Sequence, residues 1–130
     1  MKHTFILKNT LFIAGIIAFG IGVAELFFPI RFHAGSGIAL GDNVNLLNEM
    51  RAPGGTMLVM GIIILLGAFS SAFRVSSAVL ATVLYLAYGL SRLYSIAVDG
   101  MPDTLLVQAT ALEIAIGLIC ALALAKARFS

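Results

Sequence analysis

Four long apolar runs, separated by short polar stretches, make up almost the whole chain. Each run is close to the ~20 residues that an α-helix needs to cross a bilayer. The pattern predicts transmembrane helices at about 10–29, 54–73, 76–98 and 103–125. We therefore expect an all-α fold, a polytopic four-helix bundle in which residues 1–130 form one transmembrane domain.

The only long polar connection is the loop at 30–53. Asp42 or Asn43 is well placed to cap a short helix. Apolar residues of this helix recur at a helical spacing: Val44, Leu47 and Met50. The pattern predicts a short helix along the membrane surface, separated from the second transmembrane helix by a break at Pro53-Gly54-Gly55.

The charges in the loops predict the orientation. On one side of the bundle all charged residues are basic: Lys2, Lys8, Arg74, Lys126 and Arg128. The other side mixes Arg31 and Arg51 with Asp42, Glu49, Asp99 and Asp103. The positive-inside rule then predicts cytoplasmic termini in a bacterial inner membrane, with the long loop facing outward. The first apolar run continues past Gly22-Val23-Ala24, so cleavage as a signal peptide is not expected.

Composition excludes several classes of protein. Hydrophobic residues make up 61% of the chain and charged residues 11%, which a soluble domain of this size could not bury. The net charge of +2 is scattered along the chain, so nucleic acid is not an expected partner. The single cysteine, Cys120, excludes an internal disulfide and a CxxC pair. His3 and His33 lie near opposite sides of the membrane, so we expect no metal, and nothing indicates a cofactor.

Three charged residues fall inside the apolar runs. Arg92 precedes the turn at Asp99–Asp103, Glu113 lies near the middle of the last run, and Glu25 lies near the outer end of the first. At ~1.5 Å per residue, all three belong to the outer half of the bundle. A charge at the bilayer centre costs about 2.5–3.5 kcal/mol on the insertion scale, so such residues usually have a partner and often a role.

Helical phase brings these charges together. Gly15, Ala18 and Gly22 form a stripe of small residues that ends at Glu25, and such stripes pack closely in membranes. Thr110, Glu113, Gly117 and Cys120 share a face of the fourth helix. We expect Arg92 to lie between Glu113 and Glu25. Arg51, at the lip, either joins them or pairs with Glu49 or a lipid phosphate. The predicted polar cluster consists of Glu25, Arg51, Tyr85, Tyr88, Arg92, Ser95, Asp99 and Glu113.

Several short motifs carry a resemblance to a known family. They are Asn48-Glu-Met-Arg51 with Gly54-Gly55, Gly89-Leu-Ser-Arg92 through Ser95, Asp99-Gly100-x-Pro102, and Glu113. The chain resembles a family of small bacterial four-helix membrane proteins that is described only as a domain of unknown function. Its architecture is also similar to that of the wider DoxX-like group, which includes membrane subunits associated with quinone-linked oxidation. The resemblance implies a four-helix bundle with polar residues at its outward end. It does not indicate any particular reaction.

Four functions stay open at this point. The outward pocket could bind an amphiphile, such as a lipid or quinone, or dock a membrane partner. The Arg92–Glu113 pair could instead only fix the helix register. A dimeric proton-coupled transporter would use an intramembrane glutamate, although Arg92 would neutralise it. An enzyme, or an accessory subunit of a membrane oxidoreductase, would use Glu113 as a base. No nucleophile or metal set supports the enzyme, and a homo-oligomer is open in each case.

Overall fold

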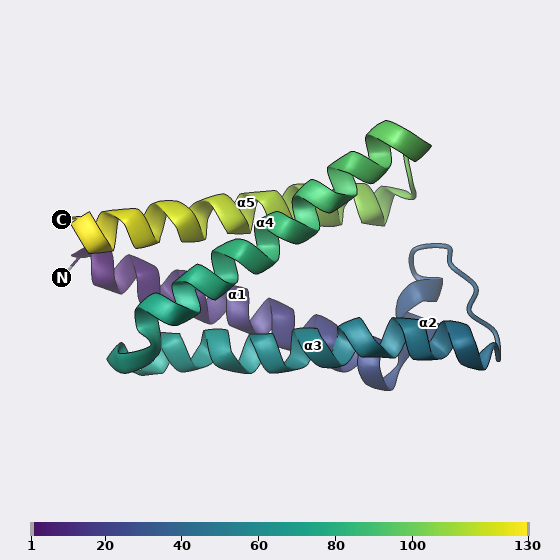
Figure 1. Cartoon of the computed structure of the whole chain (residues 1–130), viewed down its shortest axis with the longest axis horizontal. Helices are drawn as coiled ribbons and strands as arrows, with labels where there is room; N and C mark the ends of the chain where they lie inside the picture. The colour runs from purple at the N-terminus through teal and green to yellow at the C-terminus, as the bar shows by residue number, and fades with distance from the viewer. Residues whose placement is uncertain (1, 130) are drawn as a thin grey trace.

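The computed structural model describes residues 2–129, with side chains through residue 128. In chain order the elements are α1 (Lys2–Phe27), α2 (Pro29–Ala34), α3 (Val44–Phe69), the 3-10 turn η1 (Ser71–Phe73), α4 (Arg74–Asp99) and α5 (Thr104–Phe129). Over this range every regular secondary-structure element is a helix. Figure 1 shows both chain ends and η1 at one end of the bundle, here named the closed end. At the opposite end, the loop end, lie α2 and the turn between α4 and α5.

The four long helices have 26 residues each, which corresponds to ~39 Å of helix. All four are long and apolar enough to span a membrane. Large apolar side chains cover the outside of the bundle: Phe69 is 75% exposed, Val83 59% and Leu122 61%. A surface of this kind is stable against lipid and not against water. The chain is therefore a multi-pass membrane protein, as its apolar pattern predicts.

Helix α1 packs mainly against α3, through glycine. A Cβ atom added to Gly22 would overlap the backbone of Leu58, and one added to Gly61 would overlap the backbone of Phe19. The stripe of small residues predicted on the first helix is thus confirmed as a close helix–helix contact. Gly54 belongs to the same contact, because a Cβ there would lie 2.7 Å from the Leu26 nitrogen.

The predicted break at Pro53-Gly54-Gly55 is wrong. Asn43 caps the helix as expected, with its side chain accepting from the Leu46 nitrogen at 3.1 Å. The helix then continues through Pro53 to Phe69, so the expected surface helix and the second transmembrane helix are one element. Helix packing explains this outcome: Gly54 permits the contact with α1 and does not reverse the chain. The loss of one backbone hydrogen bond at Pro53 is tolerated within the packed pair.

The separate short helix lies earlier in the chain, at α2. Pro29 is its first residue, a position where the missing N–H costs no intrahelical hydrogen bond. The first helix was predicted at about 10–29 but runs from Lys2 to Phe27. The polar start of α1 is thus already helical, and Pro29 begins a new helix after the chain bends at Phe28.

Helices α4 and α5 form the second close pair, again around glycine. A Cβ on Gly89 would lie 2.5 Å from Ile114, and one on Gly117 would lie 2.6 Å from Leu86. No single helix of the α1–α3 pair contacts a helix of the α4–α5 pair as extensively as the two helices within a pair contact each other. The two pairs diverge toward the loop end, where α2 lies between them (Figure 1).

Tyr85 links the two pairs near the middle of the bundle. Its side chain is 2% exposed, and its hydroxyl donates a hydrogen bond to the Ala14 carbonyl. We expect Tyr85→Phe to lower the free energy of unfolding by about 1 kcal/mol, the usual net contribution of such a bond. Thermal unfolding in detergent measures this. Tyr94→Phe is the control, because Tyr94 is 72% exposed; equal stability of the two variants would contradict the assignment.

Candidate functional site

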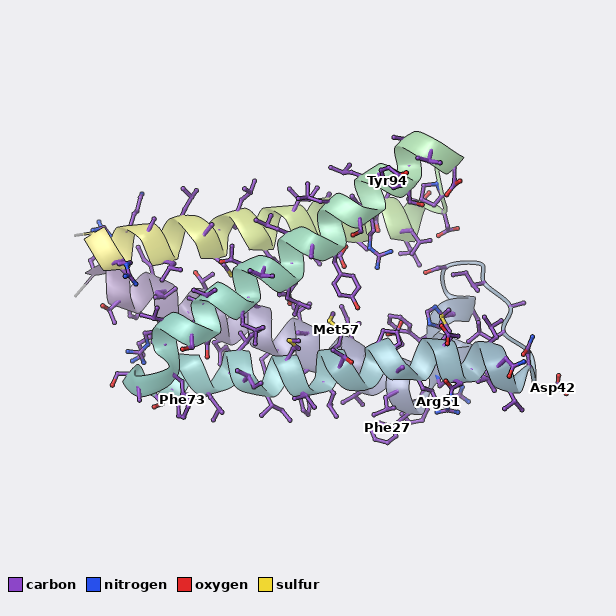
Figure 2. All side chains as sticks on the ribbon, viewed as in Figure 1. Phe27, Asp42, Arg51, Met57, Phe73 and Tyr94 are labelled. Atoms are coloured by element: carbon purple, nitrogen blue, oxygen red, sulfur yellow. The ribbon has the colours of Figure 1, made fainter. Side chains whose placement is uncertain are left out.

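A cavity of about 360 Å³ lies at the loop end, bounded by both helix pairs and by the α2 segment. It is lined by Ile21, Glu25, Phe32, His33, Ser36, Ile38, Met57, Tyr88, Arg92, Leu105, Leu106, Ala109 and Glu113. Figure 2 shows Met57 directed from α3 into the space between the pairs. Polar and charged groups therefore share the cavity wall with aliphatic and aromatic side chains.

Arg92 and Glu113 form one polar half of this wall, on α4 and α5. Arg92 Nε donates to Glu113 Oε1 at 2.6 Å, and the two side chains are 34% and 9% exposed. The Tyr88 ring flanks the guanidinium, whose Cζ lies 6.0 Å from the ring centroid. Because the bond uses Nε alone, the two terminal nitrogens of Arg92 keep their donors for other partners.

Glu25 and His33 form the other polar half, on α1 and α2. Glu25 Oε2 lies 3.2 Å from His33 Nε2, and the side chains are 13% and 11% exposed. The two atoms are close, yet Nε2 makes no hydrogen bond to any residue that the structure describes. The expected arrangement, with Arg92 between both carboxylates, is found in part: within residues 2–128 its ion pair is with Glu113, while Glu25 lines the same cavity and faces His33.

The bend after α1 places His33 at the cavity. Had α1 continued, a residue eight positions after Glu25 would lie ~12 Å away along the axis. The chain instead reverses, and the His33 carbonyl accepts hydrogen bonds from the nitrogens of Ser36 and Ile38, both at 3.0 Å. Gly37, with φ of 75°, supplies the left-handed backbone that this turn requires. Burial lowers the pKa of the His33 imidazole, since it disfavours the charged form.

Four residues of the predicted polar cluster do not line this cavity. Tyr85 lies in the core, and Ser95 and Asp99 are exposed, with Ser95 Oγ 3.5 Å from Asp99 Oδ2. Arg51 (labelled in Figure 2) donates to the Leu26 carbonyl near the end of α1. It lines a separate hollow along α3. The structure thus gathers Glu25, Tyr88, Arg92 and Glu113 of the predicted set, and adds His33, which the sequence interpretation set aside.

The cavity offers hydrogen-bonding and ionic contacts to a bound molecule. Across residues 2–129, no three potential metal-ligating side chains come close enough to hold an ion. The lining provides a paired guanidinium, two carboxylates, an imidazole and a phenol, next to apolar side chains. This combination fits a ligand with both a polar and an apolar part.

A family model covers residues 6–124, which include most of all four long helices. The chain belongs to the DUF4345 family. The description of DUF4345 is "domain of unknown function". Neither the curated proteins nor the solved structures contain a match to the chain. Membership of DUF4345 confirms the expected family of unknown function, while kinship with the DoxX-like group stays a prediction.

Proposed function

We propose that this protein binds an amphiphilic molecule, such as a lipid or a quinone, in the cavity at the loop end. The polar part of the ligand contacts Arg92, Glu113 and Glu25, and its apolar part contacts Ile21, Met57 and the other aliphatic lining. We further propose that the protein lies in a bacterial inner membrane with both termini in the cytoplasm. The cavity then opens on the outer side.

The mixed lining of the cavity is the observation that carries this proposal. Its volume of about 360 Å³ lies within the range of roughly 300–1,000 Å³ that is usual for small-molecule sites. A pair that served only to fix the helix register would be expected in a filled contact between helices. Arg92 and Glu113 instead border an open volume together with a second carboxylate. Ionisable groups at such a position are costly unless they have a partner.

The distribution of charge supports the proposed orientation. Lys2, Lys8, Lys126 and Arg128 belong to the closed end, and Asp42, Asp99 and Asp103 to the loop end. Figure 2 shows Asp42 at the extreme of the loop end. The positive-inside rule favours a cytoplasmic closed end. Cysteine labelling from either side of intact spheroplasts, at single cysteines introduced at Asp42 and at Lys126, tests this orientation.

Native mass spectrometry of the gently solubilised protein tests the binding itself. We expect a retained small molecule in the wild type, and its loss in Ala109→Phe, because the phenyl ring would fill the cavity without changing its charge. Ala111→Phe is the matched control on the same helix, since Ala111 is exposed and outside the cavity lining. Equal retention by both variants, or no retained molecule in the wild type, would contradict the proposal.

A further inference from the structure

The polar wall of the cavity has two parts, and only one of them has its charges paired through a hydrogen bond within residues 2–128. Arg92 and Glu113 neutralise each other through a bond of 2.6 Å. Glu25 receives no hydrogen bond from any residue in the described part of the chain, although its side chain is only 13% exposed. A carboxylate that is largely shielded from water and has no donor is destabilised. Glu25 is therefore a charged group of the cavity whose hydrogen-bond acceptors remain available to a bound molecule.

His33 does not supply that partner in its neutral form. The residue is 9% exposed, and Nε2 lies 3.2 Å from Glu25 Oε2 without the geometry of a hydrogen bond. Burial lowers the pKa of the imidazole, which favours the neutral form near pH 7. A neutral imidazole can present Nε2 as an acceptor. Two acceptors then lie next to each other at the cavity wall, and Nε2 of His33 is the fully buried one.

The charges that face this point come from several helices. Glu25 projects from α1, Tyr88 and Arg92 from α4, and Glu113 from α5, while the lining residue from α3 is Met57. With Arg92 and Glu113 paired and His33 neutral, one negative charge is in excess. A cation would balance that charge, whereas a phosphate would increase the imbalance and a neutral carbonyl would leave it unchanged.

We infer that the cavity takes an amphiphile with a protonated amine head, and that Glu25 Oε2 and His33 Nε2 accept hydrogen bonds from the ammonium group. The inference rests on the proposed function and narrows its ligand class. An ammonium group has three donors, so it can donate one hydrogen bond to each of these two acceptors. The apolar lining contacts the alkyl part of the ligand, and the Tyr88 ring borders the same cavity.

The same geometry makes binding depend on pH. An amine stays protonated well above pH 7, as lysine does. Acidification protonates His33, whose positive charge then balances Glu25 at 3.2 Å and competes with the ammonium group. Affinity for the amine is therefore expected to fall as pH decreases from about 7.5 to about 5, through the titration range of histidine.

Three amphiphiles of equal chain length test the inference: octylamine, octanol and octyl phosphate. Stabilisation of the wild-type protein is measured with a fluorogenic maleimide, which reacts with the single, fully buried Cys120 only when the bundle unfolds. We expect octylamine to raise the unfolding temperature and the other two to have little effect. If octanol or octyl phosphate stabilises the protein more than octylamine does, the assignment of an amine head group is wrong, but the proposed binding of an amphiphile stands. If none acts, the proposed function also fails.

Two variants localise the effect. Glu25→Gln is expected to weaken the apparent affinity for octylamine by at least about tenfold, because a charge-assisted hydrogen bond is lost. Glu49→Gln is the matched control, since Glu49 is exposed and does not line the cavity. His33→Gln is expected to reduce the pH dependence between about pH 7.5 and about pH 5. Unchanged affinity in Glu25→Gln, or an unchanged pH profile in His33→Gln, would overturn the assignment.

Discussion

Replacing Gly22 with leucine is expected to prevent the α1–α3 pair from forming. A single Cβ at this position already overlaps backbone atoms of Leu58, and it would lie 2.9 Å from the carbonyl oxygen of Gly54. Backbone atoms of a packed helix cannot move aside as a flexible side chain can. The helices would have to separate, at a cost of roughly 3 kcal/mol or more, the upper end of the overpacking range. We expect little folded protein after solubilisation.

Gly20→Leu is the control for this experiment, two residues away on the same helix. A Cβ at Gly20 meets no atom within 4 Å, so the larger side chain would extend toward lipid. The yield of monodisperse protein and the rate of maleimide labelling at Cys120 report folding in both variants. Loss of folding with Gly20→Leu, or none with Gly22→Leu, would show that the α1–α3 contact differs from the one described.

The Arg92–Glu113 pair gives the second large effect. Arg92→Leu leaves the Glu113 carboxylate, which is 9% exposed, without its donor. Breaking a buried pair from one side costs about 3–5 kcal/mol, because an unpaired charge remains. The double variant Arg92→Leu/Glu113→Met removes both charges and restores most of the lost stability. Thermal unfolding of the single and double variants, in one detergent and at one pH, measures the coupling.

If the double variant regains stability, its ligand retention shows whether the Arg92–Glu113 pair also contributes to binding. We expect the double variant to fold well but to retain less of the small molecule that co-purifies with the wild type, because one polar half of the cavity is gone. Normal retention would mean that the pair contributes only to the fold. Arg51→Leu is the matched control for the loss of an arginine: Arg51 bonds to the Leu26 carbonyl and lies outside the cavity, so it is expected to leave retention unchanged.

Helical period was sufficient to predict the number of long helices and the packing faces of the first and the last of them. The stripe of Gly15, Ala18 and Gly22 could be identified from the sequence because small residues at steps of three and four have few other uses in a membrane helix. The face of Thr110, Glu113, Gly117 and Cys120 is buried for the same reason. Periodicity reports on one helix at a time, however, and does not fix how helices meet.

The mistaken elements depend on contacts between helices. Pro53 with two following glycines is typical of a break, and only the proximity of α1 shows that Gly54 belongs inside a helix. The sequence indicates only that His33 and His3 lie near opposite sides of the membrane, and the proximity of His33 to Glu25 depends on the bend at Phe28. Depth alone leaves open whether Arg51 joins the predicted cluster or pairs elsewhere, because depth does not distinguish the two sides of α3.

The two polar halves of the cavity belong to different helix pairs. Glu25 and His33 lie on α1 and α2, and Arg92 and Glu113 lie on α4 and α5. Side-chain hydrogen bonds join the pairs near the closed end, from Arg74 to the Gly67 carbonyl at 3.0 Å and from Ser77 to the Ile63 carbonyl at 2.7 Å. Beyond Tyr85, none described joins them at the loop end.

A molecule that contacts both halves would therefore act as a crosslink between the two helix pairs, which are the arms of a hinge at the closed end. Its binding free energy would include the work of setting the angle between the arms. By linkage, any partner that binds the outside of the bundle and favours one angle between the helix pairs would alter ligand affinity without entering the cavity.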